Sequence, residues 1–353
     1  MKTLHVTMGI DPKSGGPTRS VKGLCRALDN AGIDVTLLVL HGNDKFENQG
    51  GIKVVYGKQI DIGSFELIHL HGIWDWHLHK IAAECRKSNK PYLYSPRGML
   101  DPWALGVKKW KKRLALFLYQ RKDLKGASAF HATADEEAIH FRMQGLTQPI
   151  IISPNGVDLP SAMPAERKKA KNDTKTALFM SRLHPGKGLI PLANAWAKVR
   201  PVGWRMLVVG PDDYGHKSEV MAELDRLGVE AEWEFVDMVS DSEKWEYYCS
   251  SDLLMHPSVS ENFGITIAEG LATGLPVICT KGTPWSVVVE RKCGWWIDFG
   301  IESLARAMKE AMSLTNMERR EMGERGRALV YDKFTWGAAV MAMIKGYEDI
   351  LHE

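Results

Sequence analysis

Long apolar runs are missing from this 353-residue sequence, since no stretch approaches the ~18–20 residues that a transmembrane helix needs. Cysteine is scarce: the five cysteines form no CxxC pair and no regular spacing, which argues against a disulfide framework and a zinc finger. The first residues, MKTLHVTMGID, have the pattern of a strand rather than that of a signal peptide. We therefore expect a globular protein in a reducing cytoplasm.

A strong charge of one sign is also missing, because 46 Lys and Arg stand against 43 Asp and Glu. No zinc-finger, RNP or heptad motif is visible, so we expect no nucleic-acid partner. The distribution is nevertheless uneven: residues 1–158 hold 22 Lys and Arg against 15 Asp and Glu, and the remainder holds 24 against 28. The basic first part favours an anionic partner, such as a membrane surface or a phosphorylated acceptor, although chance scatter of surface charge is the alternative.

Short apolar runs alternate with longer amphipathic segments along the whole chain. Residues 4–8, 67–70 and 92–95 have the pattern of strands, and 18–31 has that of a helix. The alternation fails at 154–175, which is rich in turn and charged residues, and then restarts. Two successive series of this kind predict an α/β fold with two doubly wound, Rossmann-like domains that face a cleft. The predicted domains are 1–158, joined by a final helix at about 336–353, and 159–335.

Two features of the first series suggest an anion site. Gly15 and Gly16 lie in the loop GIDPKSGGP between a strand and a helix, where a backbone could approach a ligand closely and a helix start attracts anions. A tight turn without a ligand is the alternative, and the loop is not GxGxxG. Arg97, in SPRG after a later strand, could hold a phosphate or carboxylate through its bidentate fork, or could be a surface arginine.

Histidines cluster after the strand at 67–70. Alternation places His69 and His71 on one face, and His77 and His79 follow. Four histidines in eleven residues suggest a metal, but no Cys or carboxylate pattern completes a site, so we expect none. We expect His71 to line the cleft and His69 to be structural.

Residues 107–124, VKKWKKRLALFLYQRKDL, combine basic residues with apolar residues at helical spacing. A helix of this kind can lie on an anionic membrane. It could equally pack its apolar stripe on the sheet and leave its lysines in solvent.

The second series carries the sharper motifs. Arg182 and Lys187 flank a Pro-Gly turn after a strand, where two cations could hold a diphosphate without a metal. Glu261 precedes a helix that begins near Gly264, and Glu269 lies on that helix, so two carboxylates could accept hydrogen bonds from sugar hydroxyls. Thr283, in GTPW after the next strand, offers further backbone donors, with a plain turn as the alternative. The segment at 210–218 has the wrong spacing for a P-loop, because His216 precedes Lys217.

Arg182, Lys187 and the pair Glu261 and Glu269, in this order at strand exits, resemble the retaining glycosyltransferases of family 4, which have the GT-B fold. PNGVD at 154–158 looks like the interdomain hinge of that family. SPRGML at 95–100, GTPW at 282–285 and CGWW at 293–296 look like a branch that assembles bacterial polysaccharide or lipopolysaccharide. The resemblance spans nearly the whole chain. One departure is Arg97, because many members of the family carry a histidine after the corresponding strand.

The resemblance implies a hexosyltransferase that takes a UDP- or GDP-linked sugar as co-substrate and needs no metal or other cofactor. Catalytic roles would fall on Glu261, Arg182, Lys187 and His71, although Arg97 could replace His71. The resemblance places the nucleotide sugar against Asn262, Phe263, Gly264, Ile265, Glu269, Gly210 and Thr283. Gly15, Gly16 and Arg97 would lie on the phosphate or acceptor side.

The implied acceptor is a glycan or a polyprenyl-diphosphate-linked saccharide, and the implied location is the cytoplasm or the inner face of the plasma membrane. Two other functions remain open. A GT-B sugar-nucleotide epimerase would turn over donor without acceptor, and a nucleotide-sugar-binding protein would not turn it over at all. The four charged residues together, Arg182, Lys187, Glu261 and Glu269, argue against a degenerate site.

Overall fold

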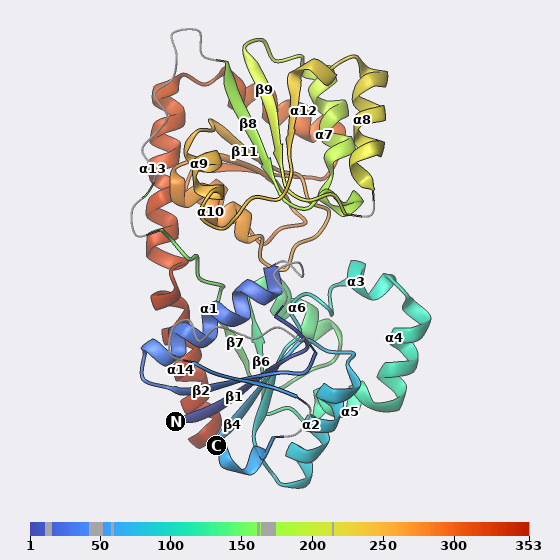
Figure 1. The fold of residues 1–353 in the computed structure, drawn as a ribbon, viewed down its shortest axis with the longest axis vertical. Helices are drawn as coiled ribbons and strands as arrows, with labels where there is room; N and C mark the ends of the chain where they lie inside the picture. Colours follow the sequence, from blue (N-terminus) through green and yellow to red (C-terminus); the bar gives the residue numbers. More distant parts are fainter. Residues whose placement is uncertain are drawn as a thin grey trace. The chain divides into compact units, whose positions relative to one another are not determined.

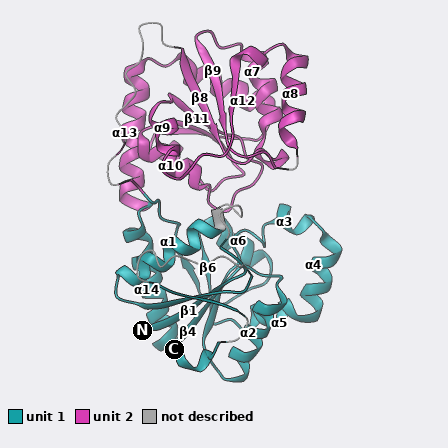
Figure 2. Ribbon diagram, viewed as in Figure 1, with its two compact units in different colours: residues 1–158, 334–353 teal, residues 159–333 magenta. Residues whose placement is uncertain are grey.

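A computed structural model describes the chain except for residues 11–15, 42–51, 58–59, 161–162, 164–173, 214 and 353. The chain divides into two compact units, Met1–Asp158 with Phe334–Glu353, and Leu159–Lys333 (Figure 2). Each unit holds one parallel sheet with helices on its faces (Figure 1). The two doubly wound domains predicted from the sequence are thereby confirmed. Within the described ranges, no helix combines the length and apolar character needed to cross a bilayer.

The first unit contains a seven-stranded sheet in the order β3-β2-β1-β4-β5-β6-β7. Its strands are β1 (Lys2–Thr7), β2 (Asp34–Val39), β3 (Lys53–Tyr56), β4 (Leu67–His71), β5 (Tyr92–Ser95), β6 (Ala129–Ala132) and β7 (Ile150–Ile152). Its helices are α1 (Gly16–Asn30), α2 (Trp76–Lys87), α3 (Pro102–Gly106), α4 (Lys109–Ala115), α5 (Arg121–Lys125), α6 (Asp135–Met143) and α14 (Trp336–His352), with the short turns η2 (Ile62–Ser64) and η3 (Leu116–Gln120).

Strand alternation builds the two faces of this sheet. In β4, Ile68 and Leu70 point into a core shared with α2, whereas Leu67 points into a core shared with α1 and α14. Tyr347 of α14 is completely buried in this second core. The final helix therefore returns to the first unit, as predicted.

The second unit contains a six-stranded sheet in the order β10-β9-β8-β11-β12-β13. Its strands are β8 (Lys175–Met180), β9 (Trp204–Val209), β10 (Trp233–Val236), β11 (Leu253–His256), β12 (Val277–Thr280) and β13 (Gly294–Ile297). Its helices are α7 (Leu189–Val199), α8 (His216–Leu227), α9 (Lys244–Cys249), α10 (Ile265–Thr273), α11 (Val287–Glu290), α12 (Ile301–Ser313) and α13 (Asn316–Lys333), with the turns η4 (Pro185–Lys187) and η5 (Glu230–Glu232).

Both sheets reverse their strand order once. The reversal lies between β1 and β4 in the first unit and between β8 and β11 in the second. Connections leave opposite faces of a doubly wound sheet at such a point, and the carboxyl ends of the two strands form a crevice there. In each unit, a ligand site is expected in this crevice.

Candidate functional site

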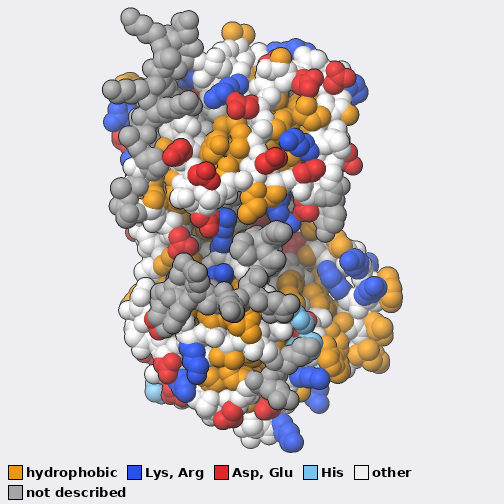
Figure 3. Space-filling model, in the orientation of Figure 1, with side chains coloured by type: hydrophobic (Ala, Val, Ile, Leu, Met, Phe, Trp, Pro, Cys, Tyr) orange, Lys and Arg blue, Asp and Glu red, His pale blue; other side chains and the backbone are white. Residues whose placement is uncertain are grey.

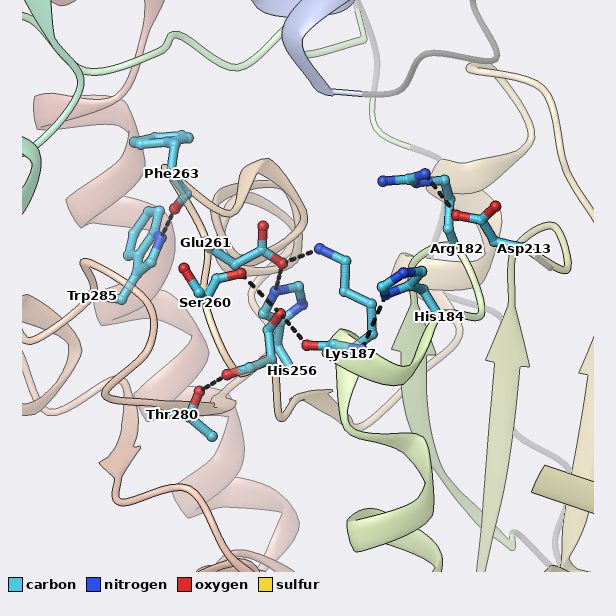
Figure 4. Close-up of polar contacts among 12 residues, drawn as sticks. Arg182, His184, Lys187, Asp213, His256, Ser260, Glu261, Phe263, Thr280 and Trp285 are labelled. Carbon is cyan, nitrogen blue, oxygen red and sulfur yellow. Dashed lines mark hydrogen bonds and ion pairs between the residues drawn. The ribbon is translucent and has the colours of Figure 1, made fainter. Parts of the chain in front are cut away.

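Two loops meet at the reversal point of the second sheet. One follows β8 and contains η4, and the other follows β11. Lys187 of the first loop places its Nζ 2.5 Å from Oε1 of Glu261 in the second. His256, the last residue of β11, places its Nε2 2.9 Å from the same oxygen. Figure 4 shows the three side chains converging, so Lys187 and Glu261, which were assigned separate roles from the sequence, are in direct contact.

Backbone contacts hold these loops in register. The amide of Val259 donates to the carbonyl of Gly186 at 2.9 Å, and the amide of Glu261 donates to the carbonyl of Gly282 at 2.8 Å. Gly188 has φ +77°, and a Cβ there would lie 2.1 Å from the carbonyl oxygen of Pro257. Only glycine allows so close an approach, which explains the glycine at position 188.

The charge of Glu261 is stabilised despite burial. Burial alone would raise the pKa of this carboxyl, but Lys187 and His256 together hold the pKa well below its ordinary value. Both contacts fall on Oε1, and Oε2 has no hydrogen bond to any described residue. An ionised carboxylate with one oxygen free can accept from a ligand hydroxyl or stabilise positive charge that develops on a sugar ring.

Arg182 lies near this cluster but is not part of it. Its Nη1 lies 2.8 Å from Oδ2 of Asp213, in an ion pair where the Arg182 side chain is 48% exposed. Figure 4 shows this pair beside the Lys187 loop. An anionic ligand would therefore have to compete with Asp213 for the guanidinium, a carboxylate that the sequence prediction did not include.

Helix α10 supplies backbone donors next to Glu261. Gly264 precedes the helix with φ +79°, and no side chain caps the first turn, which begins at Ile265. The carbonyl of Phe263 accepts from Nε1 of Trp285 at 2.5 Å, and this bond fixes the turn. Asn262 lies in the same turn. The first amides of an uncapped helix carry partial positive charge, which suits anionic oxygens.

Glu269 is buried within α10 and is already engaged. Its Oε1 lies 2.6 Å from Nζ of Lys244, and its Oε2 accepts from the hydroxyl of Tyr248 at 2.9 Å. All three side chains are buried. Both oxygens keep a second lone pair, so the predicted ribose contact would add to this pair rather than replace it.

Two predicted donor-binding positions have a local structural reason. Gly210 has φ +147°, and a Cβ there would lie 2.0 Å from the carbonyl oxygen of Ser181, so glycine is needed where β9 and β8 end side by side. Thr283 is buried and donates from Oγ1 to the carbonyl of Thr280 at 2.8 Å. Its hydroxyl thus holds the turn after β12.

In the first unit, the structure brings His71 and Arg97 together. Nη2 of Arg97 lies 3.1 Å from Nδ1 of His71, and Nη1 donates to Oγ of Ser20 at 2.8 Å. Both His71 and Arg97 are buried. Gly16 is the first residue of α1, and Gly15 lies outside the described residues.

Among the residues that the structure describes, two clusters have metal-ligand spacing, His5 with His69 and His71, and His41 with Asp75 and His77. In the first cluster, Arg97 beside His71 adds a positive charge that opposes a cation. In the second, Oδ1 of Asp75 caps α2 through the amides of His77 and Leu78, while Oδ2 bonds His41. Asp75 is thus already engaged by hydrogen bonds in the second cluster.

Several residues of the site were not predicted from the sequence: His256, Asp213, Lys244 and Tyr248. His256 could have been found, because it ends a strand beside the reversal point, as His71 does. The other three pair with predicted residues across 21 to 31 positions of sequence. No local pattern reports such a pairing.

Comparisons with known proteins indicate a glycosyltransferase. Residues 164–329 match the family model described as Glycosyl transferases group 1. The second unit therefore carries a group 1 glycosyltransferase domain. A D-inositol 3-phosphate glycosyltransferase of Segniliparus rotundus is 29% identical over 216 residues, which cover 58% of this chain and 48% of that protein. One of Corynebacterium glutamicum is 31% identical over 194 residues, covering 50% and 44%. The match spans less than half of either relative's own length.

Solved structures resemble the whole chain. Sucrose-phosphate synthase of Thermosynechococcus elongatus has a TM-score of 0.82 at 19% identity, covering 100% of this chain and 99% of that one. HepE of Anabaena, in complex with UDP and glucose, has a TM-score of 0.79 at 19% identity, covering 99% and 100%. WaaG, a glycosyltransferase of lipopolysaccharide biosynthesis, has a TM-score of 0.66 at 15% identity, covering 99% of each chain. At these identities the likeness establishes the GT-B fold.

Proposed function

We propose that the protein is a retaining glycosyltransferase of family 4 that transfers a hexose from a nucleoside-diphosphate sugar. The observation that carries the proposal is the partly buried Lys187–Glu261–His256 cluster beside the uncapped start of α10. It lies in the domain that matches the glycosyltransferase model. The donor site uses the chain's own cations and backbone amides, and we propose that it needs no metal or other cofactor.

The chemistry follows from where charge develops. The bond between the anomeric carbon and the diphosphate oxygen breaks, and a bond from that carbon to an acceptor oxygen forms. Negative charge grows on the departing diphosphate, where Lys187, Arg182 and the first amides of α10 would stabilise it. Positive charge grows on the sugar ring, where the ionised Glu261 would stabilise it. We propose that Glu269, held by Lys244 and Tyr248, accepts from the ribose hydroxyls.

The comparisons suggest which donor and which acceptor to test first. HepE has been solved with UDP, with UDP and glucose, and with UDP-glucose, so a UDP-linked hexose is the first donor to test and a GDP-linked one the second. The curated relatives are named for inositol 3-phosphate. Arg97 and the basic first unit suit a phosphorylated acceptor. A polyprenyl-diphosphate-linked saccharide fits that class, and an unphosphorylated glycan in cell-surface polysaccharide synthesis is the other acceptor that we propose to test. We propose that the first unit binds this acceptor and the second the donor.

The basic amphipathic segment 107–124 supports a role for the protein at a membrane surface. It forms α4, a π-helical turn (η3) and α5. The apolar residues Trp110, Leu114, Phe117 and Leu118 are between 51% and 86% exposed. Figure 3 shows basic and apolar side chains together over α4. We propose that this segment rests on the anionic cytoplasmic leaflet. Replacing Lys108, Lys109, Lys111 and Lys112 with Glu should abolish sedimentation with anionic vesicles, whereas unchanged sedimentation would refute this contact.

The transferase test is a turnover assay with UDP- and GDP-hexoses, each with and without a panel of phosphorylated and polyprenyl-diphosphate acceptors. Acceptor-dependent release of nucleoside diphosphate, with a product of unchanged anomeric configuration, supports the proposal. Donor turnover without any acceptor would instead indicate an epimerase. Donor binding with no turnover under any condition would indicate a nucleotide-sugar-binding protein.

A further inference from the structure

A row of buried polar side chains lies on one face of the first sheet, at the carboxyl ends of β1, β4, β5 and β6. This face is otherwise mostly apolar and packs against α1 and α14. The members of the row are almost fully buried, at 2% exposure or less: His5, His69, His71, Ser95, His131 and Tyr347. Groups so buried must hydrogen bond to one another, since water does not reach them.

The first half of the row runs from Arg97 to α14. Arg97 donates to Nδ1 of His71 at 3.1 Å. Nε2 of His71 lies 3.0 Å from Nδ1 of His5. Nε2 of His5 then lies 3.4 Å from the hydroxyl of Tyr347.

The second half runs from α14 to the end of β7. The hydroxyl of Tyr347 lies 2.6 Å from Nδ1 of His69, whose Nε2 lies 2.5 Å from Oγ of Ser95. That Oγ lies 2.7 Å from Nδ1 of His131, and Nε2 of His131 lies 2.9 Å from the carbonyl oxygen of Ser153. The seven contacts form one unbranched chain from Arg97 to Ser153.

The two ends of the chain decide the position of every hydrogen in it. A guanidinium can only donate, so Nδ1 of His71 accepts and its Nε2 carries the hydrogen. A backbone carbonyl can only accept, so Nε2 of His131 carries the hydrogen and its Nδ1 accepts from Ser95. Tyr347 and Ser95 each accept on one side and donate on the other. Each of the four imidazoles must therefore be the neutral Nε2–H tautomer.

The surrounding charges agree with neutral rings. Burial, aided by the charge of Arg97, lowers the pKa of His5 and of His131 to about 3 and holds the pKa of His69 and His71 well below the ordinary range. No carboxylate touches the rings among the residues that the structure describes. The groups that face Arg97 are Cys25 of α1, Glu137 of α6 and Tyr347 of α14.

Arg97 is held without an acid partner. Burial lowers its pKa to about 10, so the guanidinium stays charged at neutral pH. Its hydrogen bonds go to two neutral acceptors, His71 and Ser20, and it forms no ion pair within the described parts of the chain. The nearby Glu137 uses its carboxylate on the amides of Gly98 and Thr133 instead.

We propose that this chain, in which every hydrogen bond points in the same direction, is a positioning device. It fixes the tautomer of His71 and so presents Arg97, which has no ion pair among the described residues, to an anionic oxygen group of the substrate. Tyr347 of α14 joins the two halves, which makes a residue near the C-terminus part of the first unit's site. A chain of aligned hydrogen bonds also polarises its members in one direction, which strengthens the hold on the guanidinium. The substrate in this inference rests on the proposed transferase function, but the tautomers and the anion site do not.

The first test is two-bond ¹H–¹⁵N correlation of the full chain labelled at histidine nitrogens, which reports the tautomer of each ring. Four neutral Nε2–H rings are expected at pH 7 and still at pH 5.5. In Arg97→Ala, all four rings should keep the Nε2–H tautomer, because the carbonyl of Ser153 fixes the same direction from the other end of the chain, and only the signals of the neighbouring His71 should shift. In Ser95→Ala, only His69 should change. An Nδ1–H tautomer or a charged ring at pH 7 in the unaltered chain would overturn the inference.

The second test uses inorganic phosphate as the probe and the same spectra as the readout. Saturable phosphate-dependent shifts are expected at His71, and they should vanish in Arg97→Ala. Arg205→Ala, at a 40% exposed arginine that pairs with Glu234 in the second unit, is the matched control and should keep them. Absence of Arg97-dependent shifts would overturn the positioning role.

A third variant separates positioning from simple packing. Tyr347→Phe should weaken phosphate binding several-fold, because it divides the chain at its middle. Tyr92→Phe also removes a buried tyrosine hydroxyl bond, to the carbonyl of Asp123 on the other face of the sheet. It should leave phosphate binding unchanged. Equal effects of Tyr347→Phe and Tyr92→Phe on phosphate binding would show that Tyr347 contributes only to packing. If these results hold while no sugar is transferred in any assay, the proposed function fails and the anion site remains.

Discussion

Both units gather polar residues near the reversal point of a doubly wound sheet. In the first unit these residues are mostly neutral, whereas in the second they are charged. In the first unit, four histidines of β1, β4 and β6 form a neutral chain that ends in a cation, Arg97, with no ion pair among the described residues. In the second unit, the residues form charged pairs, Lys187 with Glu261, Arg182 with Asp213 and Lys244 with Glu269.

This contrast teaches how similar sheets can serve different ligands. A buried charge needs either a counter-ion or hydrogen bonds with oriented neutral groups, and a neutral chain of the second kind can hold a cation in place without neutralising it. The second unit is suited to a ligand whose charge changes during the reaction, as the negative charge of a departing diphosphate grows. The first is suited to hold a fixed anion.

Acid should have the largest effect, and it should separate the units. The lowered histidine pKa values mean that, below pH 6.5, the unfolded chain binds protons that the folded first unit refuses. Each such ring then costs about 1.4 kcal/mol of stability per pH unit down to about pH 3. The lowered pKa of Glu261 acts only below its ordinary value of 4.5, so the second unit should weaken later. The raised pKa values of Glu137 and Asp123 work the other way in the first unit, but they are two groups against four.

Urea denaturation between pH 7.5 and 5, followed by peptide-resolved hydrogen exchange corrected for intrinsic rates, measures this difference. The first unit should lose several kcal/mol over that range, while the second changes little. Equal losses in both units would contradict the neutral chain.

Glu261→Gln should have the next largest effect, because it removes the charge opposite the developing positive sugar. We expect turnover to fall roughly 10²–10³-fold with the fold intact. The matched control is Glu302→Gln, since Lys198 and Glu302 form the same pair at the same 2.5 Å but at the surface. The control should keep full turnover. Near-normal turnover of Glu261→Gln would remove this carboxylate from the chemistry.

Lys244→Met should destabilise the second unit by about 2–3 kcal/mol, because it leaves the Glu269 carboxylate buried with only Tyr248 as partner. Thermal or urea unfolding at pH 7 measures the change. A loss under about 0.5 kcal/mol would show that this pair is neither buried nor coupled as described. Tyr248→Phe should have a smaller effect, near 1 kcal/mol.

Arg182→Ala should have the smallest effect on stability, within about 0.5 kcal/mol, since its ion pair is exposed. It should raise KM for the donor about tenfold, a loss of roughly one charge-assisted contact. Asp213→Asn sharpens the test, because it frees the guanidinium and should leave KM equal or lower. A higher KM in both variants would mean that the pair itself, rather than Arg182 alone, shapes the site.

Much of the fold could be predicted from local pattern. Alternation of apolar runs located the strands around Leu67, Tyr92 and Ile150, and the failure of alternation located the connection after Asp158. The strand at Lys53–Tyr56 was not predicted, because it is short and only partly buried, and so carries little apolar signal.

Site residues that follow the ends of strands could be predicted from the sequence. Site residues that are identified only by a side-chain contact across the fold could not. Lys187 and Glu261 follow neighbouring strands at a reversal point, so their proximity follows from topology. The partner of Arg182 and the role of Tyr347 depend on side chains that meet across the fold. Tyr347 lies 278 positions from His69, and no spacing rule connects them.

The most direct test of the central claim is calorimetric titration of the full chain with UDP and with GDP, in the absence of metal. The account predicts micromolar binding of one of them, lost at least tenfold in Lys187→Ala and retained in Lys198→Ala. Equal affinity of the two variants, or no binding of either nucleotide, would contradict the assignment of the charged cluster as the donor site.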